Sequence, residues 1–231
     1  GGKHVALYFE GSYMNNTVYI NGDSVLFHPY GYTPFYCDIT PYIKIGEENV
    51  VKVVVDNSEQ VNCRWYSGSG IYRNVWLITT DKVHIANWGV GIETSSITNE
   101  SANVNLSIKV KKHGEEMVAA KLVTTIYKDG VSVGKASSDI LLSDEYLFRQ
   151  CVKVDNPELW DIDNPQLYSA EVKIVGYDDK VVDWVTEKFG IRTIEYSAKE
   201  GLKLNGRSIK LNGGCIHPDN GAIGAAAYRR A

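Results

Sequence analysis

Short runs of β-branched and aromatic residues recur along the first 80 residues and are separated by Gly, Asn, Asp and Pro. The runs that predict strands are HVALYF, TVYI, SVLF, FYCDI, VVKVVV and VWLIT. Asn21-Gly22, between the second and third runs, is a strong hairpin signal. Closely spaced strands without an intervening helical period favour an antiparallel sandwich over a βαβ fold.

A second strand series begins near Lys82. Its clearest segment, residues 103–110, alternates apolar and polar positions, which predicts a strand with one buried face. Asp129-Gly130 predicts another hairpin, and LLSDEYLFRQCVKV is interpreted as a single strand. About 110 residues of this pattern, with frequent turns, are typical of an immunoglobulin-like sandwich.

The pattern changes after Arg192. A hairpin is expected at Asn205-Gly206, followed by a strand SIKLN (208–212) and a glycine-rich polar loop, GGCIHPDNG. No amphipathic helix longer than about two turns and no repeat of fixed period is evident.

Composition excludes several classes of partner. Hydrophobic residues make up 44% and charged residues 23% of the chain, and the net charge is -4, so nucleic acid is not expected as a partner. No apolar run approaches the roughly 20 residues of a membrane span, and no signal-peptide pattern is visible. The compartment (cytoplasmic, periplasmic or secreted) stays open. The four cysteines are dispersed, which favours free, buried thiols; no metal site or other cofactor is expected.

The order of the motifs carries a resemblance to a known family. Five segments of this chain resemble, in the same order, the sugar-binding jelly-roll domain of the family 2 glycoside hydrolases: FEG, VYING, GYTPFYCDIT, NVVKVVVDN and RWYSGSGIYRNVWL. Two later segments are similar to the end of that family's immunoglobulin-like domain: PELWDIDNPQLYSAEVKI and EKFGIRTIEY. A last segment is similar to the start of its catalytic TIM barrel: LNGRSIKLNGGCIHPDNGAIG. The resemblance implies a mainly β chain: a partial jelly roll (1–81), an immunoglobulin-like sandwich (82–195) and the truncated start of a (β/α)8 barrel (196–231).

Within the family the match is nearest to β-galactosidases, whose W-x-x-S-G-I-[FY]-R turn resembles RWYSGSGIYR. The implied function is the non-catalytic N-terminal portion of a retaining glycoside hydrolase that cleaves terminal β-linked sugars, with β-galactosides favoured. The alternatives are β-glucuronidase or β-mannosidase specificity, or a free-standing carbohydrate-binding module of two sandwiches. Because the jelly roll lacks its first strands by this comparison, an open sheet edge and self-association are also expected.

Retaining hydrolysis needs two carboxylates roughly 5–5.5 Å apart, one of them with a raised pKa. The resemblance places the family's two catalytic glutamates on later barrel strands, which have no counterpart in this chain. Acidic pairs such as Glu47-Glu48 and Glu115-Glu116 lie in polar turns, as solvated surface groups do. We therefore assign no catalytic residue, and we expect this chain alone to be inactive.

The loop after the expected barrel strand supplies candidate substrate-binding residues. His217, Asp219 and Asn220 would lie at the C-terminal end of that strand, where TIM barrels place their sites. Imidazole, carboxylate and amide groups can hydrogen-bond sugar hydroxyls; the alternative is that these residues only cap the loop. Pro218 stands where the resembling loop often has a second histidine, which argues against a paired-histidine metal site.

The stretch RWYSGSGIYR supplies two further candidates. Arg64 and Trp65 precede the SGSG turn, and the resemblance brings this turn toward the barrel mouth. A guanidinium donates to hydroxyls, and an indole stacks on a sugar ring. Gly68 and Gly70 allow positive φ at the turn. Trp76 is expected in the core, and Arg73 in a buried structural pair.

Overall fold

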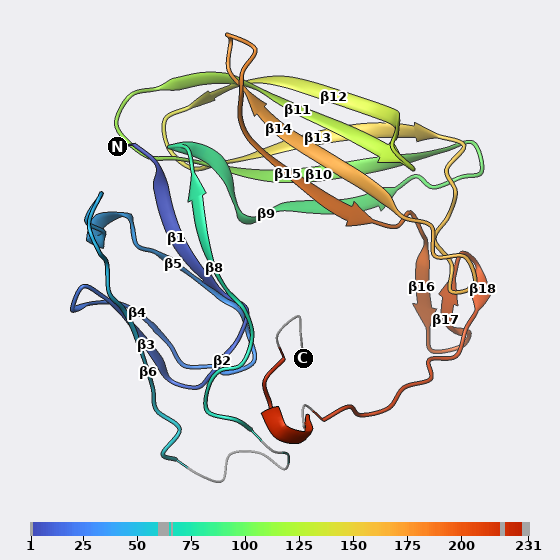
Figure 1. Cartoon of the computed structure of the whole chain (residues 1–231). Helices are drawn as coiled ribbons and strands as arrows, with labels where there is room; N and C mark the ends of the chain where they lie inside the picture. Colours follow the sequence, from blue (N-terminus) through green and yellow to red (C-terminus); the bar gives the residue numbers. More distant parts are fainter. Residues whose placement is uncertain (1, 60–64, 66, 218–219, 228–231) are drawn as a thin grey trace. The chain divides into compact units, whose positions relative to one another are not determined.

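The computed structural model describes residues 2–59, 65, 67–217 and 220–227 (Figure 1). The chain divides into two compact units. The first unit comprises residues 1–80 together with 213–231, and the second unit comprises residues 81–212. Apart from two single-turn 3-10 helices, the regular structure of the described residues is antiparallel β. The mainly β, sandwich-type fold class is confirmed.

The first unit contains two three-stranded sheets, ordered β5-β1-β8 and β4-β3-β6, and a short β2-β7 ladder. Its elements are β1 (His4–Phe9), β2 (Ser12–Tyr13), β3 (Asn16–Ile20), β4 (Asp23–His28), β5 (Phe35–Asp38), η1 (Thr40–Tyr42), β6 (Val51–Val55), β7 (Gly70–Ile71), β8 (Val75–Thr80) and η2 (Gly221–Ile223).

Alternation explains the core of the first unit. Inward positions of β1, β3 and β5 supply its buried side chains: Leu7, Phe9, Val18, Ile20, Phe35, Cys37 and, just after β5, Ile39. The β3–β4 hairpin turns at Asn21 and Gly22, with φ of 53° and 99°. These are the left-handed values that a type I′ turn requires and that this residue pair adopts readily.

The second unit contains a sandwich of a three-stranded sheet, β13-β10-β9, and a four-stranded sheet, β12-β11-β14-β15. A small sheet, β16-β17-β18, follows it in the chain. The strands are β9 (Val83–Ser95), β10 (Ser101–Lys112), β11 (Val118–Lys128), β12 (Val131–Leu142), β13 (Tyr146–Asp155), β14 (Tyr168–Val175), β15 (Val181–Phe189), β16 (Ile194–Ser197), β17 (Gly201–Leu204) and β18 (Arg207–Ser208).

The core of this sandwich follows the expected alternation. Val104, Leu106, Ile108 and Val110 on β10 are at most 2% exposed. They pack with inward residues of β11 and β14 such as Leu122. Seven strands in two antiparallel sheets over the described part of this segment match the immunoglobulin-like expectation.

Two strand predictions were wrong. LLSDEYLFRQCVKV is not one strand, because polar residues 143–145 separate the end of β12 from β13. The expected strand 208–212 is also not formed: Ser208 ends β18, and the described residues that follow have no regular structure until Asn220. A strand persists only where a neighbour pairs with its backbone, and no described residue forms a ladder with 210–212.

Two burial predictions also need correction. Trp76 is 40% exposed: its indole N–H donates to the Glu10 carboxylate at 2.8 Å, and most residues of β8 are open to solvent. Among the cysteines that the structure describes, Cys37 is buried, but Cys151 and Cys215 are exposed; all three are free. Cys63 lies outside the described residues.

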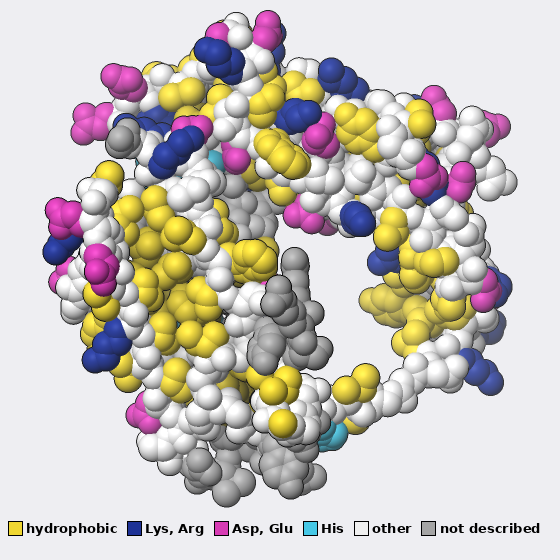
Figure 2. Space-filling view, in the orientation of Figure 1, with side chains coloured by type: hydrophobic (Ala, Val, Ile, Leu, Met, Phe, Trp, Pro, Cys, Tyr) yellow, Lys and Arg dark blue, Asp and Glu magenta, His cyan; other side chains and the backbone are white. Residues whose placement is uncertain are grey.

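Apolar side chains are also exposed in the first unit. Figure 2 shows hydrophobic side chains over its strands, and Phe27, Val51 and Leu77 are 60%, 47% and 66% exposed. Over the described ranges, none of the helices has the length and apolar character that crossing a lipid bilayer demands.

Candidate functional site

Three segments that are distant in sequence converge in the first unit: the loop 29–34, the turn that contains Trp65 and residues 67–72, and the C-terminal residues 220–227. The Tyr72 hydroxyl donates to the Gly31 carbonyl at 2.8 Å. The backbone N–H of Ala227 donates to the Tyr72 carbonyl at 2.7 Å. Tyr72 therefore joins the loop on one side and the C-terminal residues on the other.

The turn is shaped by its glycines, but only one of them in the expected way. Gly70 has φ of 100°, whereas Gly68 is not in the left-handed region. Gly68 is needed for space instead, since a Cβ there would lie 2.9 Å from the Cβ of Ala225. The Asn57 amide donates to the Ser69 hydroxyl at 2.9 Å and fixes the turn from its other side. The turn and the C-terminal residues therefore touch directly.

Of the candidates in RWYSGSGIYR, Trp65 is described and Arg64 lies outside the described residues. Trp65 is 46% exposed, and its indole N–H donates to the Tyr32 hydroxyl at 2.8 Å. This hydrogen bond thus holds the indole at the surface, and the side chain is not part of the core. Its role in substrate binding stays a prediction.

The structure describes two of the three candidates in the C-terminal loop, and these two have different surroundings. His217 is exposed and lies in a segment without regular structure; Asp219 lies outside the described residues. Asn220 closes the turn around η2: its side-chain amide donates to the Ala226 carbonyl at 3.1 Å, and its N–H to the Gly224 carbonyl at 2.8 Å. These contacts favour the loop-closing interpretation for Asn220, whereas a sugar contact by His217 stays a prediction.

Sequence reasoning overlooked an aromatic cluster formed by Tyr13, Tyr30, Tyr32, Trp65 and Tyr72. The Tyr32 ring lies 5.1 Å from Tyr13, 5.8 Å from Tyr30 and 6.4 Å from Trp65, measured between centroids. Tyr72 joins it through its bond to Gly31. Two tyrosines flanking a glycine in HPYGYTP, a segment otherwise typical of a loop, were the signal that could have revealed it.

A polar network next to this site surrounds Glu10. Its carboxylate accepts hydrogen bonds from Trp76 Nε1 at 2.8 Å and Asn74 Nδ2 at 2.9 Å, and lies 3.6 Å from Arg73 Nε. The Trp76 bond is the main cause that lowers the pKa of Glu10, opposed by burial and assisted by Asn74 and Arg73. The expected Arg73 pair is therefore present, but the Arg73 side chain is 52% exposed, so the pair is not buried.

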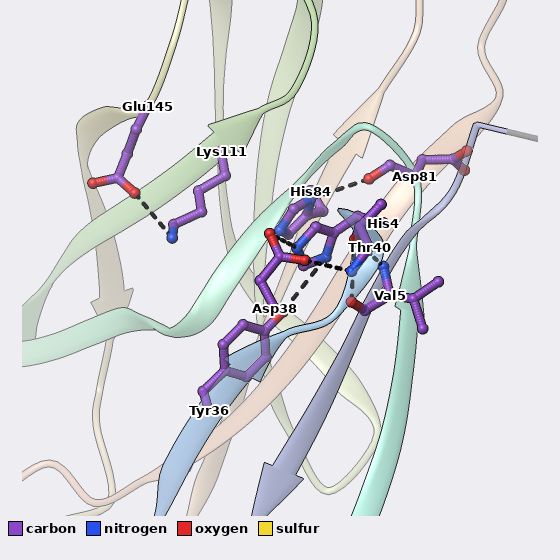
Figure 3. A network of polar contacts seen from close by, with 9 residues as sticks. All are labelled: His4, Val5, Tyr36, Asp38, Thr40, Asp81, His84, Lys111 and Glu145. Carbon is purple, nitrogen blue, oxygen red and sulfur yellow. Dashed lines mark hydrogen bonds and ion pairs between the residues drawn. The ribbon is translucent and has the colours of Figure 1, made fainter. Parts of the chain in front are cut away.

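Figure 3 shows a second network of the first unit, at β1 and β5. His4 Nε2 lies 3.3 Å from an Asp38 oxygen, and Thr40 donates its backbone N–H to Asp38 at 2.9 Å. Burial alone would raise the pKa of Asp38, but the Thr40 hydrogen bonds and the adjacent imidazole outweigh it and lower that pKa. Burial, followed by the Asp38 charge, raises the pKa of Tyr36 to about 12.

In the second unit, the same view shows two separate polar contacts. The His84 ring Nδ1 lies 3.1 Å from the Asp81 carbonyl, and Lys111 pairs with Glu145 at 3.4 Å. Lys109 pairs with the same carboxylate at 2.6 Å, and these two lysines lower the pKa of Glu145. The described carboxylates with a clear pKa shift are all lowered: Glu10, Asp38, Asp56, Glu145, Asp161 and Asp178. A general acid of a glycosidase needs the opposite shift.

Two of the relatives of this chain are β-galactosidases. It is 41% identical over 233 residues to the β-galactosidase BoGH2A of Bacteroides ovatus, covering 100% of this chain and 27% of that protein. It is 34% identical to a β-galactosidase of Thermoanaerobacter pseudethanolicus, covering 97% of this chain and 31% of the relative. The chain thus spans about a quarter to a third of the length of these relatives.

Solved structures give the same result. A glycosyl hydrolase family 2 member from Bacteroides cellulosilyticus superposes with a TM-score of 0.93 at 39% identity, over 99% of this chain and 32% of that one. A β-glucuronidase from Bacteroides uniformis superposes with a TM-score of 0.91 at 30% identity, over 97% of this chain and 28% of that one. The model of the sugar binding domain of glycosyl hydrolases family 2 matches residues 2–81, and a second model of that family matches residues 83–192. The chain belongs to glycoside hydrolase family 2.

Proposed function

We propose that this chain is the non-catalytic N-terminal portion of a retaining glycoside hydrolase that cleaves terminal β-linked sugars, with β-galactosides as its substrates. The observation that carries the proposal is the 41% identity, over its whole length, to a β-galactosidase. The turn RWYSGSGIYR supports the same specificity by its resemblance to the β-galactosidase turn. A second specificity, for β-glucuronides, is favoured by the superposition on a β-glucuronidase.

None of the six described carboxylates with a shifted pKa has the raised pKa of a general acid. Retaining hydrolysis needs a protonated carboxyl near neutral pH, next to an ionised one. Asp161 illustrates the opposite case. Burial raises its pKa, but the N–H of Asp163 and the charge of Arg207 outweigh burial and lower it. A carboxylate held ionised in this way cannot protonate a leaving oxygen at neutral pH.

The proposed contribution of the chain is to bind and orient substrate. Trp65 would offer an aromatic face, and Arg64 and His217 would hydrogen-bond sugar hydroxyls. Asp219 would contact the same hydroxyls, and Asn220 would hold the shape of the loop that carries it. Such contacts accelerate hydrolysis when they strengthen in the transition state.

The test is hydrolysis of aryl β-galactoside, β-glucuronide and β-mannoside by the 231-residue chain and by a version extended through the full barrel. We expect no turnover by the short chain and turnover of the β-galactoside by the extended one. Preference of the extended enzyme for the glucuronide would replace the proposed specificity. Turnover by the short chain that survives repurification would contradict the non-catalytic role.

A further inference from the structure

A pocket of about 410 Å³ lies within the second unit, where β9 and β15 lie beside each other (Figure 1). Sites for small molecules begin at roughly 300 Å³, so this volume is sufficient for a small organic ligand. The lining comes from β9, from the end of β15 and from the chain that continues into β16: Ile92, Thr94, Lys188, Phe189, Gly190, Arg192 and Ile194. None of the substrate-binding candidates described above belongs to this β9–β15 pocket.

The segment between β15 and β16, which carries Arg192, is fixed by its packing. A Cβ at Gly190 would lie 2.7 Å from Trp160 Cβ, so the backbone passes directly against the tryptophan. The N–H of Trp160 donates to the Ile191 carbonyl at 2.8 Å, and the Ile191 side chain is fully buried. One wall of the pocket is therefore in place before any ligand binds, which reduces the entropic cost of binding.

Arg192 presents its guanidinium in a defined orientation. The group lies over the Trp160 ring, with Cζ 5.3 Å from the ring centroid. A guanidinium stacked on an aromatic face keeps the N–H groups at its edge available to a planar acceptor. Among the described residues the arginine ion pairs are those of Arg73 and Arg207, so no described carboxylate is paired with Arg192.

The charged residues that line the pocket are both cations. Lys188 is exposed, and no lysine ion pair within the described ranges includes it. Glu93, Glu187 and Glu195 adjoin lining residues in the sequence but do not themselves line the pocket. The chain as a whole has a net charge of -4, yet two cations without a paired anion make this pocket attractive to an anion.

The rest of the lining indicates what kind of anion fits. Ile92 and Phe189 pack against the core of the sandwich, and Ile194 is 55% exposed. These side chains offer contact to an apolar group, and the Thr94 hydroxyl can donate or accept a hydrogen bond. A carboxylate matches the planar fork of a guanidinium with two parallel hydrogen bonds. The lining therefore favours a singly charged carboxylate that is attached to an apolar group.

We propose that the β9–β15 pocket is a binding site for a monocarboxylate with an apolar body, in which Arg192 pairs with the carboxylate and Lys188 adds to its attraction. The inference goes beyond the proposed function, since the pocket lies in the sandwich of the second unit and requires no glycoside. The carboxylate could belong to a free acid or to an acidic side chain of a longer parent chain. The recognition chemistry is the same, and the experiment distinguishes the two sources.

The experiment titrates the 231-residue chain with 4-fluorobenzoate at low ionic strength and follows the fluorine NMR signal of the ligand. Neutral 4-fluorobenzamide, which has the same ring but no charge, should bind about fivefold more weakly or worse. Binding of 4-fluorobenzoate should also weaken as NaCl is added, because salt screens a partly exposed ion pair.

Variants assign the contact to its residues. Arg192→Gln should weaken binding of 4-fluorobenzoate about five- to tenfold, and Lys188→Gln about two- to threefold. Arg192→Lys keeps the charge but loses the planar fork, so its affinity should fall between those of Arg192→Gln and the unmodified chain. The matched control is Arg149→Gln, exposed on β13 at the opposite edge of the sheet that contains β9, which should leave binding unchanged. All three positions are exposed, so the variants should fold, and far-UV circular dichroism checks this.

Three results would each overturn the proposal: no saturable binding of 4-fluorobenzoate, equal binding of 4-fluorobenzamide, or unchanged binding by Arg192→Gln. A version extended through the full barrel separates the two sources of the carboxylate. Binding retained in that version assigns the pocket to a free acid, and binding lost there assigns it to a carboxylate of the added segment. No glycoside takes part, so the outcome is independent of the hydrolysis test of the proposed function.

Discussion

Replacing Gly31 by alanine should destabilise the first unit by roughly 2–4 kcal/mol. The added Cβ would lie 2.1 Å from Tyr13 Cδ2, well inside the 3.5–4.0 Å of an ordinary carbon contact. Tyr13 is buried and cannot move out of the way. Overpacking of this kind costs about 1–3 kcal/mol. The loop would also move away from the Tyr72 hydroxyl and lose a hydrogen bond worth about 1 kcal/mol.

A left-handed backbone conformation adds nothing to this cost, because Gly31 does not have a positive φ. Gly213→Ala is the control, since nothing lies within 4 Å of its added Cβ. Hydrogen exchange in increasing urea separates the two units by their peptides: residues 16–20 report the first and residues 120–126 the second. A Gly31→Ala protein whose first unit exchanges like the unmodified chain would show that the steric reasoning is wrong. Additional exchange by residues 120–126 would show that the effect is not local.

Three further predictions concern Thr124 and the cysteines. Thr124→Val should cost the second unit about 1–3 kcal/mol in urea unfolding, because the Thr124 hydroxyl donates to buried Gln150 at 2.6 Å and its loss leaves the Gln150 oxygen unsatisfied. Unchanged urea unfolding of this variant would contradict the reasoning. Burial, followed by the Asp38 charge, raises the pKa of Cys37 from 9.0 to about 11. The contribution of the neutral thiol to folding stability is therefore complete below pH 9 and is lost as the pH rises through 11. The fall in Tm over this pH range should be smaller in Cys37→Ala, and an identical fall in both proteins would exclude the thiol as its cause. Iodoacetamide should alkylate exposed Cys151 before Cys37, which is 3% exposed, and peptide mass spectrometry that found the reverse order would contradict the assigned burial.

The turns could be predicted from the sequence because their causes are local. Asn21, Asp129 and Asn205 each precede a glycine and each has a positive φ, of 53°, 50° and 49°. The small size and polar groups of these residues permit that conformation without help from the rest of the fold. The strand β12 was harder to place, because its middle, GKASSD, has little β propensity. Its strand conformation comes from pairing with β11 over its whole length, which is a tertiary effect.

In the candidate site, too, some features could be predicted from the sequence and others depend on the tertiary structure. Trp65 could be named from its sequence context, and the structure places it at the surface beside Tyr32. Its contact with Tyr32 could not be foreseen, because the two residues lie 33 positions apart. The exposure of Trp76 was missed for a related reason: alternation identifies the two faces of a strand but does not show whether another layer of the fold covers either face.

In the glycoside hydrolase proposed above, the aromatic cluster and the carboxylates would have different tasks. The described carboxylates with shifted pKa values, Glu10 and Asp38 among them, are held ionised by hydrogen bonds and neighbouring cations. Such groups stabilise the fold but are poor proton donors at neutral pH. The exposed rings of Tyr30, Tyr32 and Trp65 offer contact area without titratable chemistry near pH 7. A segment of this composition can raise the affinity for a sugar, or orient it, without altering the proton transfers that break the glycosidic bond. Variants of the cluster in the extended enzyme should therefore change KM or kcat without moving the pH optimum, whereas loss of a catalytic carboxyl would change the pH profile itself.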